Sequence, residues 1–357
     1  MARHTHSELP EVFTRAEALA AGLSRHQSEW SLRSGAWIAL RRGVYCAKAT
    51  LASLGPDAHH RLHAIAALKA HDERHVLSHA SAALTYGLPM PLQGPGRPSL
   101  TIDGKPASTD RQQDLIIQVA GLRPQDVRDW GRWRRTSPAR TIADCLRHLP
   151  APDAVAMADR ALRSGLASVE AIVSAVQWQS GWPYFTRAHR AMPLIDGRRE
   201  SWLESYSHVV LHDRGIPLPI PQVTILDVDG AFVARVDGLW PGRGVVAESD
   251  GWSKYWLASA GEAESDDPAE VAQARIEGAR RAFVVEKRRE DRLRALGLEI
   301  VRWGTQAIVH QPGQVERDIR AAWQRADPTR VTARYVFPSS DGLVAVETGV
   351  EGLKRPA

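Results

Sequence analysis

The sequence predicts an α+β protein of several domains, and two observations lead to that prediction. The chain has 357 residues, which is long enough for two or three domains. Short β-branched stretches bounded by glycine alternate with apolar-periodic stretches typical of helices. We divide the chain into five parts: residues 1–50, residues 51–185, a hinge at 186–197 that contains Pro193 and Gly197, residues 198–325, and a poorly ordered tail at 326–357.

Residues 8–50 carry the pattern of a winged helix-turn-helix. Two capping boxes, at Thr14 and Ser24, each open a short helix, and a β-hairpin follows as the wing. A small helical cap with solvated arginines is the alternative interpretation. We favour DNA binding because both the second helix and the hairpin tip carry polar or basic side chains that suit DNA. Side chains of this kind read a major groove or hold phosphates. The candidate DNA-binding residues in this part are Arg25, Gln27, Arg33, Arg41 and Arg42.

Residues 51–185 predict a middle α/β domain with a less specific pattern. We expect strands at 98–102 and 115–119, and helices at 56–71, 78–89, 136–146, 151–163 and 169–176. Six histidines lie between His59 and His79, two pairs of them at helical spacing. Because no His-Glu-x-x-His pattern is present, partly exposed helix histidines are a better interpretation than a zinc site.

Acidic residues near the C-terminus predict a metal site. Asp237 and the pair Glu248 and Asp250 lie in two strand-like stretches joined by a glycine-containing turn at 241–244. A hairpin would bring three carboxylates to one sheet end, which is costly unless a hard cation joins them. Glu204, on a helix expected at 198–214, adds a fourth oxygen ligand. The sequence therefore predicts Mg²⁺ at this place.

A basic helix follows the acidic stretches. Residues 275–294 hold eight Lys or Arg against four Asp or Glu, and the whole chain has a net charge of +5. A solvated helix with Glu–Arg ion pairs is the alternative interpretation. It explains the spacing of acidic and basic residues but not why most of the basic residues are arginine, whose side chain suits phosphate groups. The expected phosphate contacts are Arg288, Arg292 and Arg302. Residues 258–274 resemble an acidic insertion that is disordered.

Residues 198–303 resemble the PD-(D/E)XK nuclease superfamily, in the branch akin to very-short-patch-repair endonucleases. That branch carries Asp on one strand, Glu-x-Asp-Gly on the next, and a basic helix that ends in Gly before a strand with Arg. The resemblance implies an αβββαβ restriction-endonuclease-like fold, in which Asp237, Glu248 and Asp250 bind Mg²⁺. The superfamily's Glu-x-Lys is replaced here by Glu248-Ser249-Asp250. A catalytic lysine would therefore come from Lys254 or Lys287, or the activity is lost.

The N-terminal and middle parts resemble AbiEi-like antitoxins of type IV toxin–antitoxin systems, which act as transcriptional repressors. The middle resemblance includes the Ser-Pro-Ala-Arg-Thr stretch at 137–141. Two functions therefore remain open, with a neutral scaffold as a weaker third. The first is a metal-dependent DNA endonuclease with its own DNA-binding domain. The second is a regulator or antitoxin with an inactive nuclease-like domain, whose partners are DNA and a cognate toxin or a second copy of the chain.

The remaining features predict a cytoplasmic location without a membrane partner. Cys46 and Cys145 are the only cysteines, they lie far apart, and we expect both to be buried free thiols in a reducing compartment. The N-terminal stretch has no apolar core of the kind found in signal peptides, and no apolar run reaches membrane-spanning length.

Overall fold

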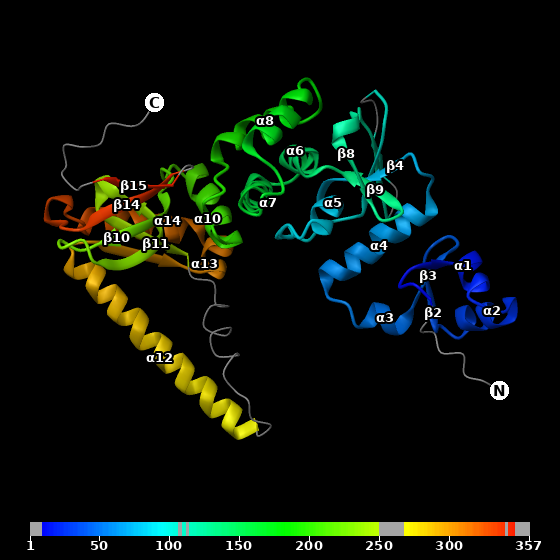
Figure 1. Cartoon of the computed structure of the whole chain (residues 1–357), viewed down its shortest axis with the longest axis horizontal. Coiled ribbons are helices and arrows are strands. Elements are labelled where there is room, and N and C mark those ends of the chain that lie inside the picture. The colour runs from blue at the N-terminus through cyan, green and yellow to red at the C-terminus, as the bar shows by residue number, and fades with distance from the viewer. Residues whose placement is uncertain (1–8, 106–108, 112–113, 250–267, 340–341, 347–357) are drawn as a thin grey trace. The chain divides into compact units, whose positions relative to one another are not determined.

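The computed structural model describes residues 9–105, 109–111, 114–249, 268–339 and 342–346, and it mixes helices and strands throughout (Figure 1). The chain divides into two compact units, Met1–Ile195 and Asp196–Ala357. The described strands form one three-stranded and two six-stranded sheets. The prediction of a mixed α and β protein with several domains is therefore confirmed at this level.

The first unit begins with a three-stranded antiparallel sheet in the order β1-β3-β2. Two capping boxes, Thr14 with Glu17 and Ser24 with Gln27, open the first two helices as expected. Phe13 and Trp37 pack edge to face, 4.7 Å between ring centroids, in the core between these helices and the sheet. The elements are β1 (Phe13–Thr14), α1 (Arg15–Ala20), α2 (Arg25–Arg33), β2 (Trp37–Arg41) and β3 (Val44–Ala47).

Residues 1–50 and 51–185 were expected to be separate domains, but both belong to the first unit. The reason is α4 (Pro56–Ala70), which follows α3 (Lys48–Ala52) and packs in two directions. Leu62 of α4 joins the core formed by β2 and β3, while Ala67 joins the core of the next sheet. Polar contacts add to this connection, since Lys69 lies 2.6 Å from Glu17.

The second sheet of this unit has six strands in the order β6-β7-β5-β4-β9-β8. Its strands are β4 (His75–Leu77), β5 (Ser99–Ile102), β6 (Thr109–Arg111), β7 (Ile116–Val119), β8 (Val127–Trp130) and β9 (Trp133–Thr136), with η2 (Pro124–Asp126) before β8. Its helices are α5 (His79–Thr85), α6 (Pro138–His148), α7 (Ala151–Arg163) and α8 (Val169–Trp178). The predicted helices and the strands β5 and β7 are confirmed. The other strands were missed because they are short and mostly polar.

The expected hinge at 186–197 is largely helical. It contains most of α9 (Phe185–Ala191) and all of η3 (Met192–Leu194), and the buried Ala188 and Ala191 hold α9 against the unit. The boundary between the two units falls near the end of the expected hinge, after Ile195. Most of the segment expected to be a hinge is therefore helical.

The second unit is built on a six-stranded sheet in the order β13-β12-β11-β10-β14-β15. Only β12 and β13 pair in parallel, and α12 (Pro268–Ala295) lies between them in the chain. The expected hairpin at 241–244 is confirmed: η4 (Pro241–Arg243) is followed by Gly244, whose φ of 64° favours glycine. The strands are β10 (Ile220–Leu226), β11 (Phe232–Trp240), β12 (Val245–Ser249), β13 (Glu299–Trp303), β14 (Arg334–Ser339) and β15 (Gly342–Val346).

Each face of this sheet is covered by a hydrophobic core. On one face, Trp240 and Trp303 pack with residues of α10 (Trp202–Asp213), α13 (Thr305–His310) and α14 (Pro312–Arg325). On the other face, Val236 and Val246 pack with Leu293 near the end of α12. These two layers of helices fix the sheet between them, so the ends of its central strands are held in place.

Two predictions about the second unit are wrong in part. The tail expected at 326–357 contains η5 (Pro328–Arg330) and β14, which pairs with β10 because Ala333 and Tyr335 are buried against the sheet. Within the insertion expected at 258–274, residues 268–274 form the start of α12, and residues 258–267 lie outside the described part. None of the described helices combines the length and apolar character that a membrane crossing requires.

Candidate functional site

Two buried carboxyl groups meet at one end of the strands β11 and β12. Gly238 pairs with Ala247, so Asp237 and Glu248, the next residue on each strand, lie at the same sheet end. Both are buried, with exposed fractions of 8% and 3%. The backbone N–H of Ser249 donates a hydrogen bond to Oδ2 of Asp237 at 2.8 Å, which ties the two strand ends together. The hairpin therefore brings together the acidic pair that the sequence predicted.

Glu204 supplies a third buried carboxyl group from α10. Ser201 caps this helix by accepting a hydrogen bond from the Glu204 N–H, and this cap places Glu204 in the first turn. Its Oε2 accepts hydrogen bonds from Nε2 of Gln222 at 2.9 Å and from the N–H of Glu200 at 3.0 Å. Burial raises the pKa of Glu204, and the nearby charge of Asp237 raises it further. Glu204 and Asp237 are therefore electrostatically coupled.

Gln222, which the sequence analysis did not single out, lies between Glu204 and Asp237 and has an unusual backbone conformation. Its neighbours in β10 pair with Gly238 and Val236, so Gln222 lies opposite Asp237 on the adjacent strand. Its φ is +57°, a left-handed value that is unfavourable for a residue with a Cβ. Side-chain bonding to Glu204 accompanies this strain, and such strain tends to persist at functional sites. No local sequence signal predicts it.

Arg289 of α12 forms an ion pair with Glu248 of the acidic pair. Its Nη2 lies 2.6 Å from Oε1 of Glu248 and donates to the carbonyl of Arg235 at 3.0 Å, while Nη1 lies 2.9 Å from Glu286. Burial raises the pKa of Glu248 to about 8, because the effect of Arg289, which lowers it, is outweighed by burial and Asp237. Arg302 also lowers the pKa of Glu248, so Arg289 and Arg302 together offset the effect of burial only in part.

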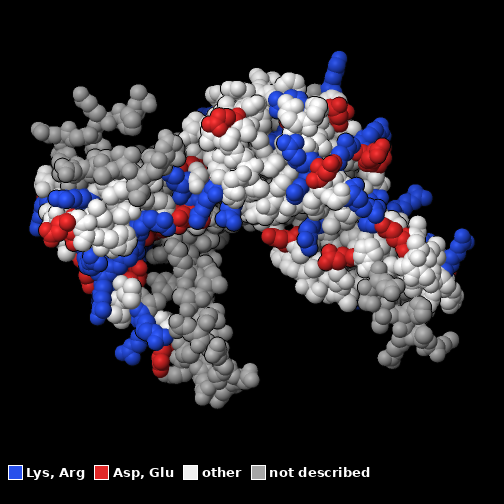
Figure 2. Space-filling view, in the orientation of Figure 1, with Lys and Arg blue, Asp and Glu red and all other residues white. Residues whose placement is uncertain are grey.

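The other predicted residues of this site are distributed around it. Arg302 of β13 lies beside Glu248 in the parallel ladder and donates to Glu286, and Arg292 donates to the carbonyl of Phe232 at 3.1 Å. Lys287 and Arg288 are exposed on α12. Figure 2 shows Lys and Arg side chains gathered where α12 meets the sheet. Asp250 and Lys254 lie outside the described residues.

The carboxyl oxygens at the strand ends are the hard donors that Mg²⁺ prefers. Asp237 and Glu248 are the described groups best placed to share a cation. Glu204 is hydrogen-bonded to Gln222, which lies opposite Asp237 on β10. In the described part of the chain, no three His, Cys, Asp or Glu side chains are arranged to hold a metal ion. Asp250, the further ligand that the sequence predicts, lies outside the described residues.

The DNA-binding candidates of the first unit fall into two groups. Arg25, Gln27 and Arg33 are exposed on α2, and Arg42 is exposed at the hairpin tip. The prediction that Arg41 is exposed there is wrong. Its side chain is only 8% exposed and lies 3.2 Å from Asp114, because the tip packs against the segment before β7. Trp30, 58% exposed on α2, was missed by the sequence analysis and lies among the exposed polar residues.

Comparison with known proteins connects the chain to two relatives. They are named "Uncharacterized protein MT2308", from Mycobacterium tuberculosis strain CDC 1551 / Oshkosh, and "Uncharacterized protein Rv2248", from strain ATCC 25618 / H37Rv. Each is 32% identical over 212 residues, which cover 59% of this chain and 69% of the relative. No family model matches the chain.

Proposed function

We propose that this chain, which belongs to the family of those two Mycobacterium tuberculosis proteins, is a DNA-binding protein with a Mg²⁺-dependent endonuclease domain in its second unit. The observation that carries the proposal is the pair of buried carboxyl groups of Asp237 and Glu248 at the ends of adjacent strands. Buried like charges are unfavourable unless a cation joins them. Glu204 adds to the same need, since its pKa is raised by burial and by Asp237.

The order of elements supports a nuclease-like fold for this unit. Helix α10 is followed by the strands β10, β11 and β12, then by α12 and β13. This is the αβββαβ order implied by the resemblance to the PD-(D/E)XK superfamily. The acidic residues lie on the second and third strands of that series, and α12 brings basic side chains to the same sheet.

Each residue of the site has a proposed role. Asp237, Glu248 and Asp250 would hold Mg²⁺, and Glu204 would add an outer oxygen ligand. Bound Mg²⁺ supplies a water of lowered pKa and neutralises charge on the phosphate. Lys254 or Lys287 would stabilise the phosphate during attack, and Arg288, Arg292 and Arg302 would hold flanking phosphates. Arg289 would leave Glu248 when the cation binds, because both neutralise the same carboxylate.

The first unit would carry the DNA-binding function as a winged helix-turn-helix. The exposed side chains of Arg25, Gln27 and Arg33 project from the helix α2, and Arg42 projects from the hairpin tip. A helix with arginine and glutamine near its beginning suits a major groove, and an arginine at a wing tip suits phosphates. Arg41 has no such role in this proposal, because it is paired with Asp114.

A second candidate function is a regulator or antitoxin whose nuclease-like unit is inactive. One observation favours it: Arg289 forms an ion pair with Glu248 and so takes up a carboxylate that a metal ion would need. The absence of lysine from the position of Asp250 agrees with that alternative. In this case the partners would be DNA and a cognate toxin or a second copy of the chain, as the resemblance to AbiEi-like antitoxins implies.

One experiment separates the two functions. The purified chain is incubated with plasmid and single-stranded DNA in Mg²⁺ or Mn²⁺, beside Asp237→Asn and Glu248→Gln. Asp318→Asn, a change at an exposed acid on α14, is the matched control. Cleavage that is lost in both site variants and kept in the control supports the nuclease. Absence of cleavage, with DNA binding that Arg25→Ala and Arg42→Ala abolish, rejects the nuclease and favours the regulator.

A further inference from the structure

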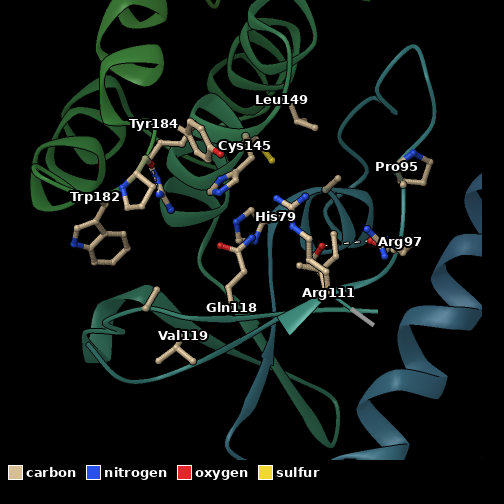
Figure 3. Close-up of a pocket in the computed structure, with 18 residues that line it drawn as sticks. His79, Pro95, Arg97, Arg111, Gln118, Val119, Cys145, Leu149, Trp182 and Tyr184 are labelled. Carbon is tan, nitrogen blue, oxygen red and sulfur yellow. Dashed lines mark hydrogen bonds between the residues drawn. The ribbon is translucent and has the colours of Figure 1, made fainter. Parts of the chain in front are cut away.

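The first unit contains a cavity of about 420 Å³ that is separate from the acidic site (Figure 3). Its wall comes from the beginning of α5, the loop before β5, the strands β5 to β7, the end of α6 and the segment 182–184. This volume falls in the range of small-molecule sites in proteins. The cavity therefore has room for a ligand of several rings or groups.

Three arginines, Arg97, Arg111 and Arg147, line the wall of the cavity. His79 and His148 also line it, and burial lowers the pKa of both, so they add no charge near pH 7. Arg147 is held in place by Asp144 at 3.1 Å and by Gln179 at 2.7 Å. In the view of Figure 3, Arg97 and Arg111 lie on the same side of the cavity. Arginines in such a wall favour an anionic ligand with several acceptor oxygens.

His79 offers an unused polar atom to the cavity. Its residue is 6% exposed, and Nδ1 lies 2.8 Å from Oγ of Ser78. Nε2 is buried and has no hydrogen-bond partner among the described residues. If Nδ1 carries the ring proton and donates it to Ser78, Nε2 is an acceptor without a partner. If Nδ1 accepts from Ser78, Nε2 carries the proton and is a donor without a partner. A buried polar atom without a partner is unfavourable, so a ligand group that bonds to it would be stabilised.

The opposite side of the cavity is aromatic. Trp182 lies beside two guanidinium groups, 5.1 Å from Arg140 and 5.2 Å from Arg147, which hold its ring in place. Tyr184 is 47% exposed and lies 5.6 Å from the ring of His148. Figure 3 shows Trp182 and Tyr184 across the cavity from Arg97 and Arg111. Flat rings on this side favour a planar ring in the ligand.

Backbone strain also gathers at this cavity. Three non-glycine residues have positive φ in the described part of the chain, and two of them, His79 at 54° and Tyr184 at 64°, line it. Such conformations cost about 1–3 kcal/mol each and persist where the surrounding structure enforces them. Strained residues of this kind are common at binding sites, and two of them line this cavity.

We propose that this cavity binds a nucleoside monophosphate, with the base against Trp182 and Tyr184 and the phosphate between Arg97 and Arg111. Nε2 of His79, between the two sides, bonds to the sugar or to the phosphate. A planar ring joined to a dianion matches the aromatic and cationic sides at once. The inference does not depend on the proposed nuclease activity, because the two sites lie in different units.

The test is titration calorimetry of the full chain with AMP, GMP, CMP and UMP, beside adenosine and inorganic phosphate. We expect at least one nucleotide to bind ten times more tightly than either fragment. Arg111→Gln, a change at an exposed residue, is expected to weaken binding at least fivefold, and Trp182→Leu likewise. Arg160→Gln, at an exposed residue of α7 outside the cavity, is the matched control and keeps the affinity of the unchanged chain.

Two outcomes would overturn the inference. One is the absence of nucleotide binding at millimolar concentration by a chain whose circular dichroism shows it folded. The other is binding of inorganic phosphate as tightly as any nucleotide, which would leave only an anion site. An unchanged affinity in Arg111→Gln would also count against it, because that variant removes a cation without disturbing the core.

Discussion

Nη2 of Arg289 lies 2.6 Å from Oε1 of Glu248, so a side chain of α12 contacts the buried carboxyl group at the end of β12. The same guanidinium reaches Glu286 and the carbonyl of Arg235. Among the described residues, Arg289 lowers the pKa of Glu248 more than Arg302 does. A cation that binds Asp237 and Glu248 would therefore weaken the contact between Arg289 and Glu248.

We predict that Arg289→Gln lowers the free energy of unfolding by about 2 kcal/mol, because it leaves a buried carboxyl group without its partner. Added Mg²⁺ should stabilise this variant more than the unchanged chain, since the cation replaces the lost charge. Urea unfolding in EDTA and in Mg²⁺ measures both effects. Arg288→Gln, at the exposed neighbour, is the control. Equal unfolding curves for the two variants would contradict the prediction.

A second prediction concerns the strained backbone of Gln222. Both Gln222→Ala and Gln222→Gly lose the bond to Glu204, but only glycine accepts a φ of +57° without strain. The glycine variant should therefore be more stable than the alanine variant by about 1–2 kcal/mol. Thermal unfolding of the pair provides the comparison.

The control for this pair is Thr224, two residues further along the same strand, where the backbone is ordinary. There Thr224→Ala should be more stable than Thr224→Gly, since glycine weakens a strand. The same order at both positions would show that the strain at Gln222 has no energetic weight.

The third prediction is a pH dependence that comes from His208 of α10. Burial lowers its pKa to about 3, with Arg199 lowering it further and Asp196 opposing. The unfolded chain binds a proton near pH 6.5, but the folded chain does so only near pH 3. The stability that His208 contributes is therefore present above pH 6.5 and is lost as the pH falls below it, by up to about 1.4 kcal/mol per pH unit.

His208→Leu should thus lose less stability than the unchanged chain between pH 7 and pH 5. At pH 7 it should be no less stable, because both ring nitrogens of His208 are buried without partners among the described residues. Urea unfolding at several pH values measures the slope. His212→Leu, at an exposed position on the same helix, should keep the slope of the unchanged chain. Identical slopes in all three proteins would refute this assignment.

The fourth prediction concerns Arg140, which is 1% exposed in the first unit. Its guanidinium lies 2.9 Å from Asp144 and 3.2 Å from Asp126, and it donates to the carbonyl of Gly121 at 2.7 Å. Arg140→Leu should lower the free energy of unfolding by about 3 kcal/mol, because two buried carboxylates each lose one of two arginine partners; Asp126 keeps Arg123 and Asp144 keeps Arg147. Arg140→Lys should recover only part of this loss, since lysine has no planar fork.

Arg160→Leu, at an exposed position of α7, is the control and should change stability by less than about 0.5 kcal/mol. Chemical unfolding followed by circular dichroism compares the variants. A small effect of Arg140→Leu would mean that the buried carboxyl groups take up protons or rearrange with little cost.

Features that depend on neighbouring residues could be predicted from the sequence. The capping boxes of α1 and α2 close over three residues, so Thr14 with Glu17 and Ser24 with Gln27 formed as expected. The hairpin between β11 and β12 needed only a short glycine-containing turn and two β-branched strands. The burial of Cys46 and Cys145 also agrees with the sequence. Strands such as β8 and β9 were missed because they are short, polar and stabilised by pairing with each other.

The sequence by itself determined the mixed α and β character, most helices, and the approach of Asp237 to Glu248, because each depends on local hydrogen bonds or on one short turn. Only the tertiary structure decided which cation meets Glu248, since the packing of α12 turns Arg289 toward the sheet and leaves Lys287 exposed. It also paired Arg41 with Asp114 and placed Gln222, His79 and Tyr184 in strained conformations. These outcomes depend on contacts between distant segments, which periodicity and turn chemistry do not encode.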